Sequence, residues 1–293
     1  MNLKFAYFPG CAASTSGREY DASFRDICKA LDIELTDIPD WNCCGSHVTY
    51  VFKPDLAIGL SSRNLALAEK IGSDIVTGCS GCYQTLKRTN EILKHDSEAQ
   101  EKNKSVLEAI GLSYGGGVKV KHALEILTEP TTLAKISEKT IRPLKGLKIA
   151  PYYGCAVLRP QFEDSFDDPE QPQSLDKIIK AVGAEPVPYI DKTRCCGGVM
   201  VLKHEEVGLE MTRRLLVNAK QTGANCMTTL CSLCHLNLDI MQPKIERAFN
   251  LEIGMPVFFF TQLIGLALGM APVELGLDKH MIPPLELLKQ QQG

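Results

Sequence analysis

Short apolar runs alternate with amphipathic stretches along this chain, in an order that predicts strands followed by helices. Residues 4–8 form an apolar run that ends in a Pro-Gly turn, which is typical of a strand. Residues 24–31 then carry apolar side chains at i, i+3, i+4 and i+7, the spacing of one helix face. A second such stripe runs from Leu60 to Ile71, with Asn64 as its polar member. The chain therefore opens as a strand followed by helices.

The same alternation continues to the end of the chain. It predicts strands at 75–76, 148–153 and 226–230, and helices at 83–93, 174–182, 205–221 and 233–241. Strands that alternate with helices favour a largely parallel sheet, so we expect an α/β fold. The apolar stripe from Val257 to Leu268 predicts a packed helix that closes the second half, with a docking surface for a partner as the alternative.

Ten of the twelve cysteines fall into two sets with one spacing pattern. In both sets, 34 residues separate the vicinal pair from the final Cys-x-x-Cys. The gap between the first cysteine and the vicinal pair differs: it has 31 residues in the first set and 39 in the second. The segment from Asp164 to Gln173 has the character of an inserted loop that accounts for the difference. The first set is Cys11, Cys43, Cys44, Cys79 and Cys82, and the second is Cys155, Cys195, Cys196, Cys231 and Cys234.

The sequence around the cysteines is repeated as well, which indicates a duplicated domain. The segment from Lys4 to Cys11 matches that from Lys148 to Cys155, and the segments before Cys79 and Cys231 also correspond. Pro143 and Gly146 mark a seam before the second copy. We therefore predict two tandem Rossmann-like α/β domains, residues 1–143 and 144–293, with the cysteines where strands end and helices begin.

Composition narrows the classes of function. The net charge is −3 and no basic run is present, so nothing indicates a nucleic-acid partner. The longest apolar stretch, Pro256 to Pro272, falls short of the ~20 residues of a membrane span. The first residues do not have the form of a signal peptide. We expect a cytoplasmic protein, in which cysteines at motif spacing bind metal or carry out redox chemistry.

Five thiols per set fit a cluster of several irons better than one ion. Structural zinc takes four ligands in a tetrahedron, and adjacent cysteines diverge too much to bind one small ion together. A cubane 4Fe–4S cluster also needs only four cysteines. Gly45 and the Gly197-Gly198 pair would let the backbone approach cluster sulfides. Zinc in at least one half and redox-active dithiols without metal are the alternatives.

The doubled pattern, Cys-x31-Cys-Cys-Gly-x33-Cys-x2-Cys and its second copy, resembles the tandem cysteine-rich CCG domain. The family that covers the chain is the B subunit of CoB–CoM heterodisulfide reductase from methanogenic archaea. The resemblance implies that each half holds a noncubane 4Fe–4S cluster on all five of its cysteines. It also implies that the two clusters face one cavity, which takes the mixed disulfide of coenzyme M and coenzyme B.

In that family each cluster supplies one electron and captures one sulfur, so two thiols leave. The resemblance thus assigns catalysis to Cys44 and Cys196 with their clusters, and all ten motif cysteines as ligands. The chain has no flavin or nucleotide fingerprint and no ferredoxin motif. The implied partners are therefore the ferredoxin-like and flavoprotein subunits of heterodisulfide reductase. The rival functions are an iron–sulfur subunit of a flavin-dependent hydroxyacid oxidoreductase and a non-catalytic zinc scaffold.

A disulfide that carries sulfonate, phosphate and carboxylate groups requires cations around its cavity. The substrate-binding candidates are Arg159, Arg194, Lys203 and His235, with Lys192, Lys53 and Arg63 as further cations near the motifs. His47, His204 and His235 are also candidate proton donors, since imidazole titrates near neutrality. Cys28 and Cys226 have no counterpart in the other half, and we interpret them as buried apolar side chains. Solvated surface charge is the alternative for each cation.

Overall fold

Two parallel four-stranded sheets organise the chain, one in each half. The computed structural model describes residues 3–290. The first sheet has the order β2-β1-β3-β4 and the second the order β6-β5-β7-β8, so the two halves share one topology. The strands are β1 (Leu3–Tyr7), β2 (Ile33–Asp37), β3 (Ile75–Thr77), β4 (Val120–His122), β5 (Lys148–Tyr152), β6 (Glu185–Pro186), β7 (Cys226–Thr229) and β8 (Val257–Phe259). The predicted parallel α/β fold and its duplication are confirmed.

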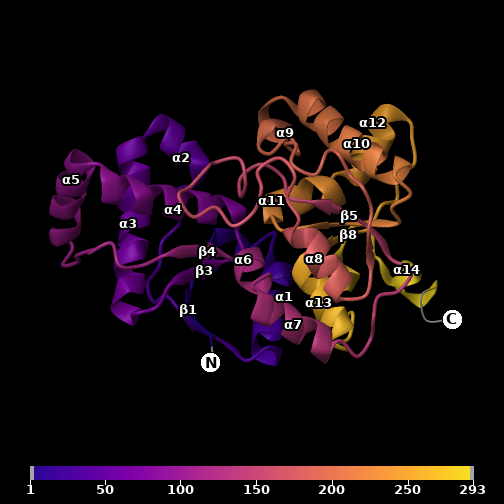
Figure 1. Cartoon of the computed structure of the whole chain (residues 1–293). Helices are drawn as coiled ribbons and strands as arrows, with labels where there is room; N and C mark the ends of the chain where they lie inside the picture. Colours follow the sequence, from indigo (N-terminus) through magenta and orange to yellow (C-terminus); the bar gives the residue numbers. More distant parts are fainter. Residues whose placement is uncertain (1–2, 291–293) are drawn as a thin grey trace.

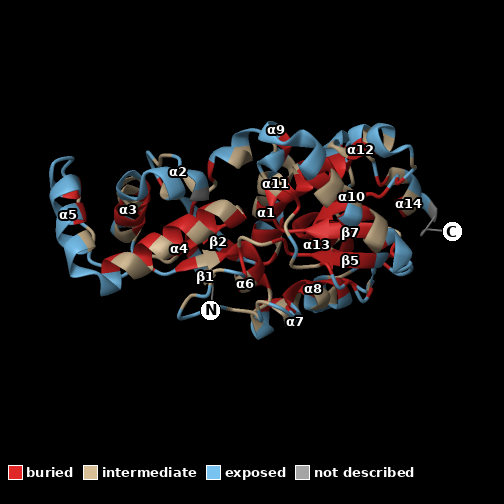
Figure 2. Ribbon diagram, turned by 90° about the horizontal axis from the view of Figure 1, so that it is seen from above, coloured by how far each residue is buried: buried red, intermediate tan, exposed pale blue. Residues whose placement is uncertain are grey.

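The strand sequences explain why these sheets are parallel. Residues of β3, β7 and β8 are buried on both faces, as in a parallel sheet covered by helices on each side. Such strands need continuous apolar runs, and Ile75-Val76 and Val257-Phe258-Phe259 provide them. Figure 2 shows the buried residues in red, concentrated on the strands and on the helix faces that cover them.

Helices connect successive strands and cover the sheets (Figure 1). Those of the first half are α1 (Arg18–Ala30), α2 (Ser46–Phe52), α3 (Pro54–Ile71), α4 (Ser80–His95), α5 (Ser97–Glu108), α6 (Ala123–Leu127) and α7 (Pro130–Lys139). Those of the second half are α8 (Ser174–Ala181), α9 (Met200–Lys203), α10 (Glu205–Gln221), α11 (Ser232–His235), α12 (Gln242–Phe249), α13 (Phe260–Ala267) and α14 (Leu285–Gln290). None of the helices among the described residues has the length and apolar character of a membrane span.

Two predicted helices differ from the structure in form. The stripe from 257 to 268 begins as edge strand β8 and becomes helix α13 only at Phe260, because its first residues pair with β7. The helix predicted at 233–241 is the single turn α11 followed by a π-helical turn, Leu236–Ile240. A short apolar run does not distinguish a buried strand from a helix, which accounts for the first difference.

The two halves pack against each other through equivalent helices. Helix α1 of the first half packs against α13 of the second, and α8 of the second packs against α6 and α7 of the first. The Tyr20 ring on α1 stacks on Phe259, with the ring centroids 4.6 Å apart. Beside them, the hydroxyls of Ser23 and Thr261 lie 2.7 Å apart. Because α1 corresponds to α8, and α6 to α13, the contact is reciprocal, as at a twofold axis.

One hydrophobic core consequently runs through both halves. It includes Phe24 and Leu124 from the first half and Leu175 and Phe258 from the second. The predicted seam at 142–146 lies between α7 and β5, and the division into 1–143 and 144–293 stays a prediction.

The predicted inserted loop reaches across to the first half. The Asp164 carboxylate lies 2.6 Å from the ammonium of Lys87, whose side chain on α4 is almost fully buried. The Lys87 ammonium also lies 5.5 Å from the centroid of the Phe162 ring. A cation that is buried in this way needs its partner, because an unpaired charge is costly in the interior. The loop therefore helps to hold the halves together.

We predict that His122 makes the fold sensitive to acid. Its imidazole is fully buried, its Nδ1 accepts a 3.1 Å hydrogen bond from the Leu124 amide, and burial lowers its pKa to about 3. The unfolded chain protonates this group near pH ~6.5, so stability falls by about 2 kcal/mol as the pH drops from about 7 to about 5. His122→Asn keeps a helix-capping acceptor without the titration.

Urea unfolding of the two proteins at both pH values measures this effect. The His122→Asn variant should lose about 2 kcal/mol less than the parent over that interval. His95→Asn is the control, since the His95 side chain is exposed. An equal pH dependence of the parent and His122→Asn would contradict the assignment.

Candidate metal centres

Each cysteine set gathers at the carboxyl edge of its sheet. Cys11 follows β1 and Cys79 follows β3, which are neighbouring strands, and Cys155 and Cys231 follow β5 and β7 in the same way. The carboxyl ends of adjacent parallel strands meet at one edge, which is where α/β folds build their sites. The vicinal pairs enter from the loops that precede α2 and α9.

The helices that follow begin earlier than predicted. Cys79 and Cys231 are the N-cap residues of α4 and α11, so Cys82 and Cys234 lie inside the first turn of each helix. In α4, which is four turns long, this places Cys82 among amide groups that have no partner within the helix. The positive end of the helix favours thiolate over thiol there.

The five sulfurs of the first set form two groups of close contacts. The sulfurs of Cys44 and Cys82 lie 3.4 Å apart, and Cys82 also shares a hydrogen bond with Cys79. Cys11 and Cys43 form the other contact. None of the twelve cysteines forms a disulfide.

The second set forms one continuous chain of sulfur contacts. Hydrogen bonds link Cys155 to Cys195, Cys195 to Cys196, Cys196 to Cys234, and Cys234 to Cys231. The contacts run from Cys196 to Cys234 before they reach Cys231, and the Cys44–Cys82 contact has its counterpart in Cys196–Cys234. The two halves therefore build two versions of one site.

The close contacts lower the pKa of some thiols and raise the pKa of others. The hydrogen bond with Cys82 lowers the pKa of Cys44 to about 7, and that with Cys234 lowers the pKa of Cys231 to about 6. Burial, with added repulsion from Cys43, raises the pKa of Cys11 to about 11. Such a set holds its protons unevenly and releases them when a cation binds, because the ligand form of cysteine is the thiolate.

Amide groups also point at the sulfurs. The backbone N–H of Ser46 donates to Cys44 Sγ, and that of Gly198 donates to Cys196 Sγ, each at 3.4 Å. The side-chain amide of Asn237 donates to Cys196 Sγ at 3.4 Å as well. Hydrogen bonds to sulfur are the means by which proteins tune iron–sulfur centres. Sequence reasoning missed Asn237 and its counterpart Thr85, which lies at the same distance after the last motif cysteine of the first half and hydrogen-bonds Cys44.

Two glycines make room for the sulfurs. Gly10 has φ +71°, and a Cβ built there would lie 2.8 Å from Cys82 Sγ. Gly154 has φ +69°, and its Cβ would lie 3.0 Å from Cys234 Sγ. Real Cβ atoms do not approach sulfur so closely, so each Gly-Cys step needs glycine for both its backbone and its space. The signal was present in the sequence, since both copies read Gly-Cys at this point.

The two sites adjoin each other between the halves. The hydroxyl of Ser80, next to Cys79, donates to the carbonyl of Leu230, next to Cys231, at 3.2 Å. The Ser80 hydroxyl also hydrogen-bonds the thiol of Cys231 itself. The buried ring of Tyr20 lies close enough to Cys79 and Cys231 that both sulfurs raise its pKa. One residue therefore joins the two cysteine sets.

The spread of the sulfurs favours a cluster over a single ion. Among residues 3–290, the group of three ligand atoms found mutually within 4.8 Å is His235, Asp239 and His280, and it contains no cysteine. A zinc ion with bonds near ~2.3 Å would need its sulfurs closer together than this limit. The donor set of thiols and amide N–H groups, without carboxylates, fits iron–sulfur chemistry.

The His235 group has a structural role in this fold. His235 is buried, and its Nε2 lies 2.9 Å from the Val257 carbonyl. Asp239 accepts hydrogen bonds from the amides of Met281 and Ile282, which holds the C-terminal segment against the second half. Burial lowers the pKa of His235 to about 4, so the ring is neutral near pH 7. The structure thus places this candidate in the core.

The other candidate cations lie on the surface of the second half. Arg159 and Arg194 line a cavity of about 280 Å³ together with Cys195. Arg194 forms a 2.6 Å ion pair with Asp191, whereas Arg159 has no ion pair among the described residues. Lys203 is exposed on α9, away from this cavity. The structure therefore brings Arg159 and Arg194 together beside a motif cysteine.

The remaining predicted residues are divided between surface and core. Arg63 is bound to Asp40, and Lys192 is bound to the Pro172 carbonyl and Asp176. Cys28 and Cys226 are buried, and burial raises the pKa of both thiols. Lys53 and His204 are exposed, and the side chain of His47 lies outside the described part of the structure.

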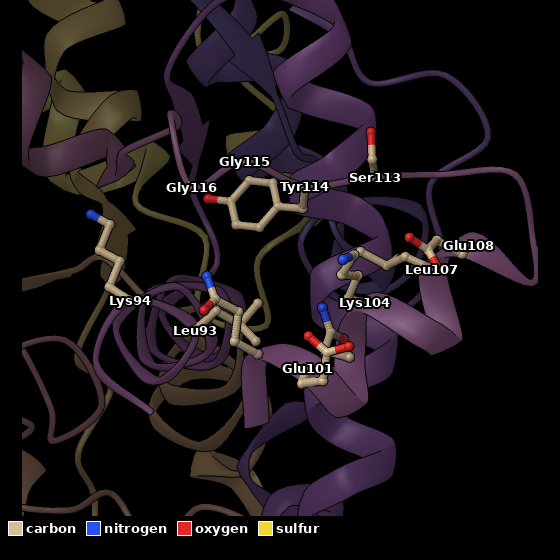
Figure 3. Close-up of a pocket in the computed structure, with 12 residues that line it drawn as sticks. Leu93, Lys94, Glu101, Lys104, Leu107, Glu108, Ser113, Tyr114, Gly115 and Gly116 are labelled. Carbon is tan, nitrogen blue, oxygen red and sulfur yellow. The ribbon is translucent and has the colours of Figure 1, made fainter. Parts of the chain in front are cut away.

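A larger cavity lies far from the cysteines. Its volume is about 580 Å³, and α4, α5 and the loop at 113–116 enclose it (Figure 3). Lys94, Glu101, Lys104 and Glu108 supply charges of both signs around its edge. No motif cysteine lines it, so size alone does not identify the redox site.

Comparison with known proteins agrees with this geometry. The family profile described as "Cysteine-rich domain" (CCG) matches residues 5–87 and 149–239. The chain belongs to the CCG family. Each CCG match contains all five cysteines of its set, and the two matches fall in the two halves of the fold.

Two CCG relatives match over almost their whole length. One is 34% identical over 98% of this chain and 100% of its own length: "8-methylmenaquinol:fumarate reductase membrane anchor subunit" of Wolinella succinogenes. Another is 33% identical over 97% of this chain and 96% of its own: the B subunit of the ferredoxin/F(420)H(2)-dependent CoB-CoM heterodisulfide reductase of Methanosarcina acetivorans. These relationships support an iron–sulfur redox role for this CCG protein within a complex of several subunits.

A solved structure shares the fold. The crystal structure of a hypothetical protein from Helicobacter pylori superposes with a TM-score of 0.75 over 96% of this chain and 52% of that chain. The sequence identity is 16%, so this likeness shows the CCG chain's architecture alone.

We predict that Gly10→Ala empties the first site and leaves the second intact. The new Cβ would displace Cys82, so anaerobically purified protein should lose about half of its iron and acid-labile sulfide. Gly72→Ala is the control for a positive φ, because Gly72 has φ +75° and nothing within 4 Å of its Cβ position. Gly10 has ψ 166°, a conformation almost confined to glycine, whereas Gly72 has ψ 28°, so Gly10→Ala carries the greater backbone strain. Equal iron content in the two variants would contradict the role of Gly10.

Proposed function

We propose that this protein is the subunit that reduces the mixed disulfide of coenzyme M and coenzyme B to two thiols. The observation that carries the proposal is the placement of two five-cysteine sites side by side, joined through Ser80, Leu230 and Cys231. One disulfide has two sulfur atoms, and its reduction takes two electrons. Two adjoining redox sites match both numbers.

Each site would hold a noncubane 4Fe–4S cluster on its five cysteines. Cys11, Cys43, Cys44, Cys79 and Cys82 would ligate the first, and Cys155, Cys195, Cys196, Cys231 and Cys234 the second. When bound, each cluster supplies one electron at a time. Cys44 and Cys196 are the buried members of their vicinal pairs and receive the amide hydrogen bonds, so we assign them the central positions in catalysis.

The overall step is balanced by electrons and protons from outside the chain. The S–S bond takes up two electrons and two protons and yields two thiols. Of the candidate proton donors, His235 is neutral and hydrogen-bonded, and His204 is exposed directly after α9. The exposed Cys11 and Cys43 leave the first site open to water, which can deliver the protons.

The anionic ends of the substrate would bind in the cavity beside Cys195. Arg159 is the cation of that cavity that has no carboxylate partner among residues 3–290, whereas Arg194 and Arg214 are paired with Asp191 and Glu210. A guanidinium binds sulfonate, phosphate or carboxylate with two parallel hydrogen bonds. A buried neutral imidazole offers no charge to an anion, so His235 is a weaker candidate for binding the substrate than Arg159.

The electrons would come from ferredoxin-like and flavoprotein subunits of a heterodisulfide reductase complex in the cytoplasm. The basis is the chain's relation to the B subunit of such an enzyme and the motifs that its own sequence lacks.

We predict that Cys196→Ala abolishes turnover of the coenzyme M–coenzyme B disulfide with reduced viologen as donor. Loss of a ligand that also receives two amide hydrogen bonds should lower the rate more than about 100-fold. Cys28→Ala is the control, because Cys28 lies in the core of α1, outside both sites. Full activity of Cys196→Ala would refute its assignment, and loss of cluster in Cys28→Ala would refute the core assignment.

We predict that Arg159→Ala weakens substrate binding rather than chemistry. The Michaelis constant for the disulfide should rise about 10-fold with kcat nearly unchanged, as expected for the loss of one charge-assisted hydrogen bond. Arg159→Lys should recover part of the affinity, and Arg247→Ala, on α12, is the control. An unchanged Michaelis constant would remove Arg159 from the binding site.

A second function is favoured by the relative from Wolinella succinogenes, which covers the chain at 34% identity. In that alternative, the protein would be an iron–sulfur subunit that passes electrons to a flavin-containing dehydrogenase partner, as for hydroxyacid or fumarate oxidoreductases. The same assay separates the two: viologen-reducible clusters without turnover of any disulfide in a panel would support electron transfer. Zinc without sulfide would indicate a scaffold instead.

A further inference from the structure

Two short surface segments carry an unusual share of exposed apolar side chains. The first covers residues 46–56 and the second residues 199–207, and we call them the rim segments. Within the rim segments, the most exposed of the large apolar side chains are Val51, Phe52 and Leu202, at 70%, 76% and 86% of their surface. Half of the large apolar side chains that are exposed among the described residues lie in the rim segments, namely Val48, Val51, Phe52, Leu56, Val199, Met200, Leu202 and Val207. Such clustering marks an interaction surface.

The exposure is repeated position by position in the two halves. The residue before α3, Lys53, has φ −146° and ψ 72°, and the residue before α10, His204, has φ −131° and ψ 70°, so these positions correspond. Counted from them, Val48 matches Val199, Val51 matches Leu202 and Leu56 matches Val207. Each pair has similar exposure, with 54% and 51% for Leu56 and Val207. Isolated exposed side chains would not recur in register.

Each rim segment begins beside one of the two cysteine sites. The first starts at Gly45, next to Cys44, and its Ser46 amide bonds the Cys44 sulfur. The second follows Gly198, whose amide bonds the Cys196 sulfur. Figure 1 shows α2 and α9 along the same upper edge of the molecule, and Figure 2 shows them at the surface with exposed residues in pale blue. A partner that covers both segments would sit over both redox sites.

The charges of the rim segments favour a protein with an acidic face. Lys53 and Lys203 are exposed and have no ion pair among the described residues. The acidic residues Asp55 and Glu205 are already paired with Lys102 and Lys244, which leaves Glu206 as the acid without such a pair. Complementary charge around an apolar centre is typical of protein–protein interfaces.

We propose that the rim segments form the docking surface for an acidic redox protein that passes electrons to both cysteine sites. This inference rests on the proposed function, since it concerns the electron supply of the same sites. A bilayer is the alternative occupant of an exposed apolar surface, and crosslinks to lipid would identify it. The pseudo-twofold repetition lets one partner contact equivalent residues of the two halves at once.

Site-specific photo-crosslinking in cells of the source organism tests the occupant. A benzophenone amino acid at position 51 or 202 should crosslink to the same polypeptide, and that polypeptide should contain an iron–sulfur cluster or flavin. The controls are positions 106 and 273, since Val106 and Val273 are exposed apolar residues outside the rim segments. Crosslinks to lipid, to a second copy of this chain or to a protein without a redox group would overturn the proposal, as would no product at either rim position.

The double variant Val51→Ser, Leu202→Ser tests the consequence. Disulfide turnover by the native complex with its own electron donor should fall at least ~10-fold, because hot spots at an interface centre carry most of the binding energy. Turnover driven by reduced viologen should not change, since both side chains are largely exposed and neither is a candidate ligand. Val106→Ser with Val273→Ser is the matched control. Equal loss in both assays would contradict docking, and failure of the parent protein with viologen would count against the proposed function instead.

Discussion

Five thiols crowded at the edge of one sheet cannot all ionise unless a cation compensates their repulsion, and this constraint governs the architecture of both halves. The pKa shifts are paired: the contacts with Cys82 and Cys234 are the largest causes that lower the pKa of Cys44 and Cys231, and the same contacts raise the pKa of Cys82 and Cys234. Amide groups and glycine backbones surround the sulfurs without adding carboxylates that would compete as ligands. Such a site is prepared for a cluster whose irons replace the protons.

Duplication of the domain produces two such sites, and the packing of the halves fixes their relative position. Helix α1 packs against α13, and its counterpart α8 packs against α6, so the halves exchange equivalent contacts around a shared core. The stacked rings of Tyr20 and Phe259 and the Ser23–Thr261 contact lie in this interface. Because the strand ends that carry Cys79 and Cys231 approach each other there, adjacency of the two sites is a consequence of how the halves pack. Rigid positioning of this kind is what a reaction on one S–S bond requires.

Much of the fold and of the site could be predicted from the sequence, for identifiable reasons. The repeated cysteine spacing identified the two sets of cysteines that the structure gathers, and the alternation of strands and helices identified the parallel sheets. The strand at 257–259 was not recognised, because a buried apolar run has no periodicity that separates strand from helix. The side-chain amide of Asn237, the Lys87–Asp164 pair and the burial of His235 depend on contacts between segments far apart in the chain. No local pattern records such contacts, and no spacing rule shows that His235 points toward Val257 rather than toward the cysteines.

The central claim is that both halves hold iron–sulfur centres near enough to act on one disulfide. Electron paramagnetic resonance of anaerobically purified, partly reduced protein tests this claim most directly, because two paramagnetic clusters at adjoining sites couple magnetically. We expect iron–sulfur signals from both halves that are split by their mutual interaction. Two uncoupled signals, or a protein that contains zinc in place of iron, would contradict it.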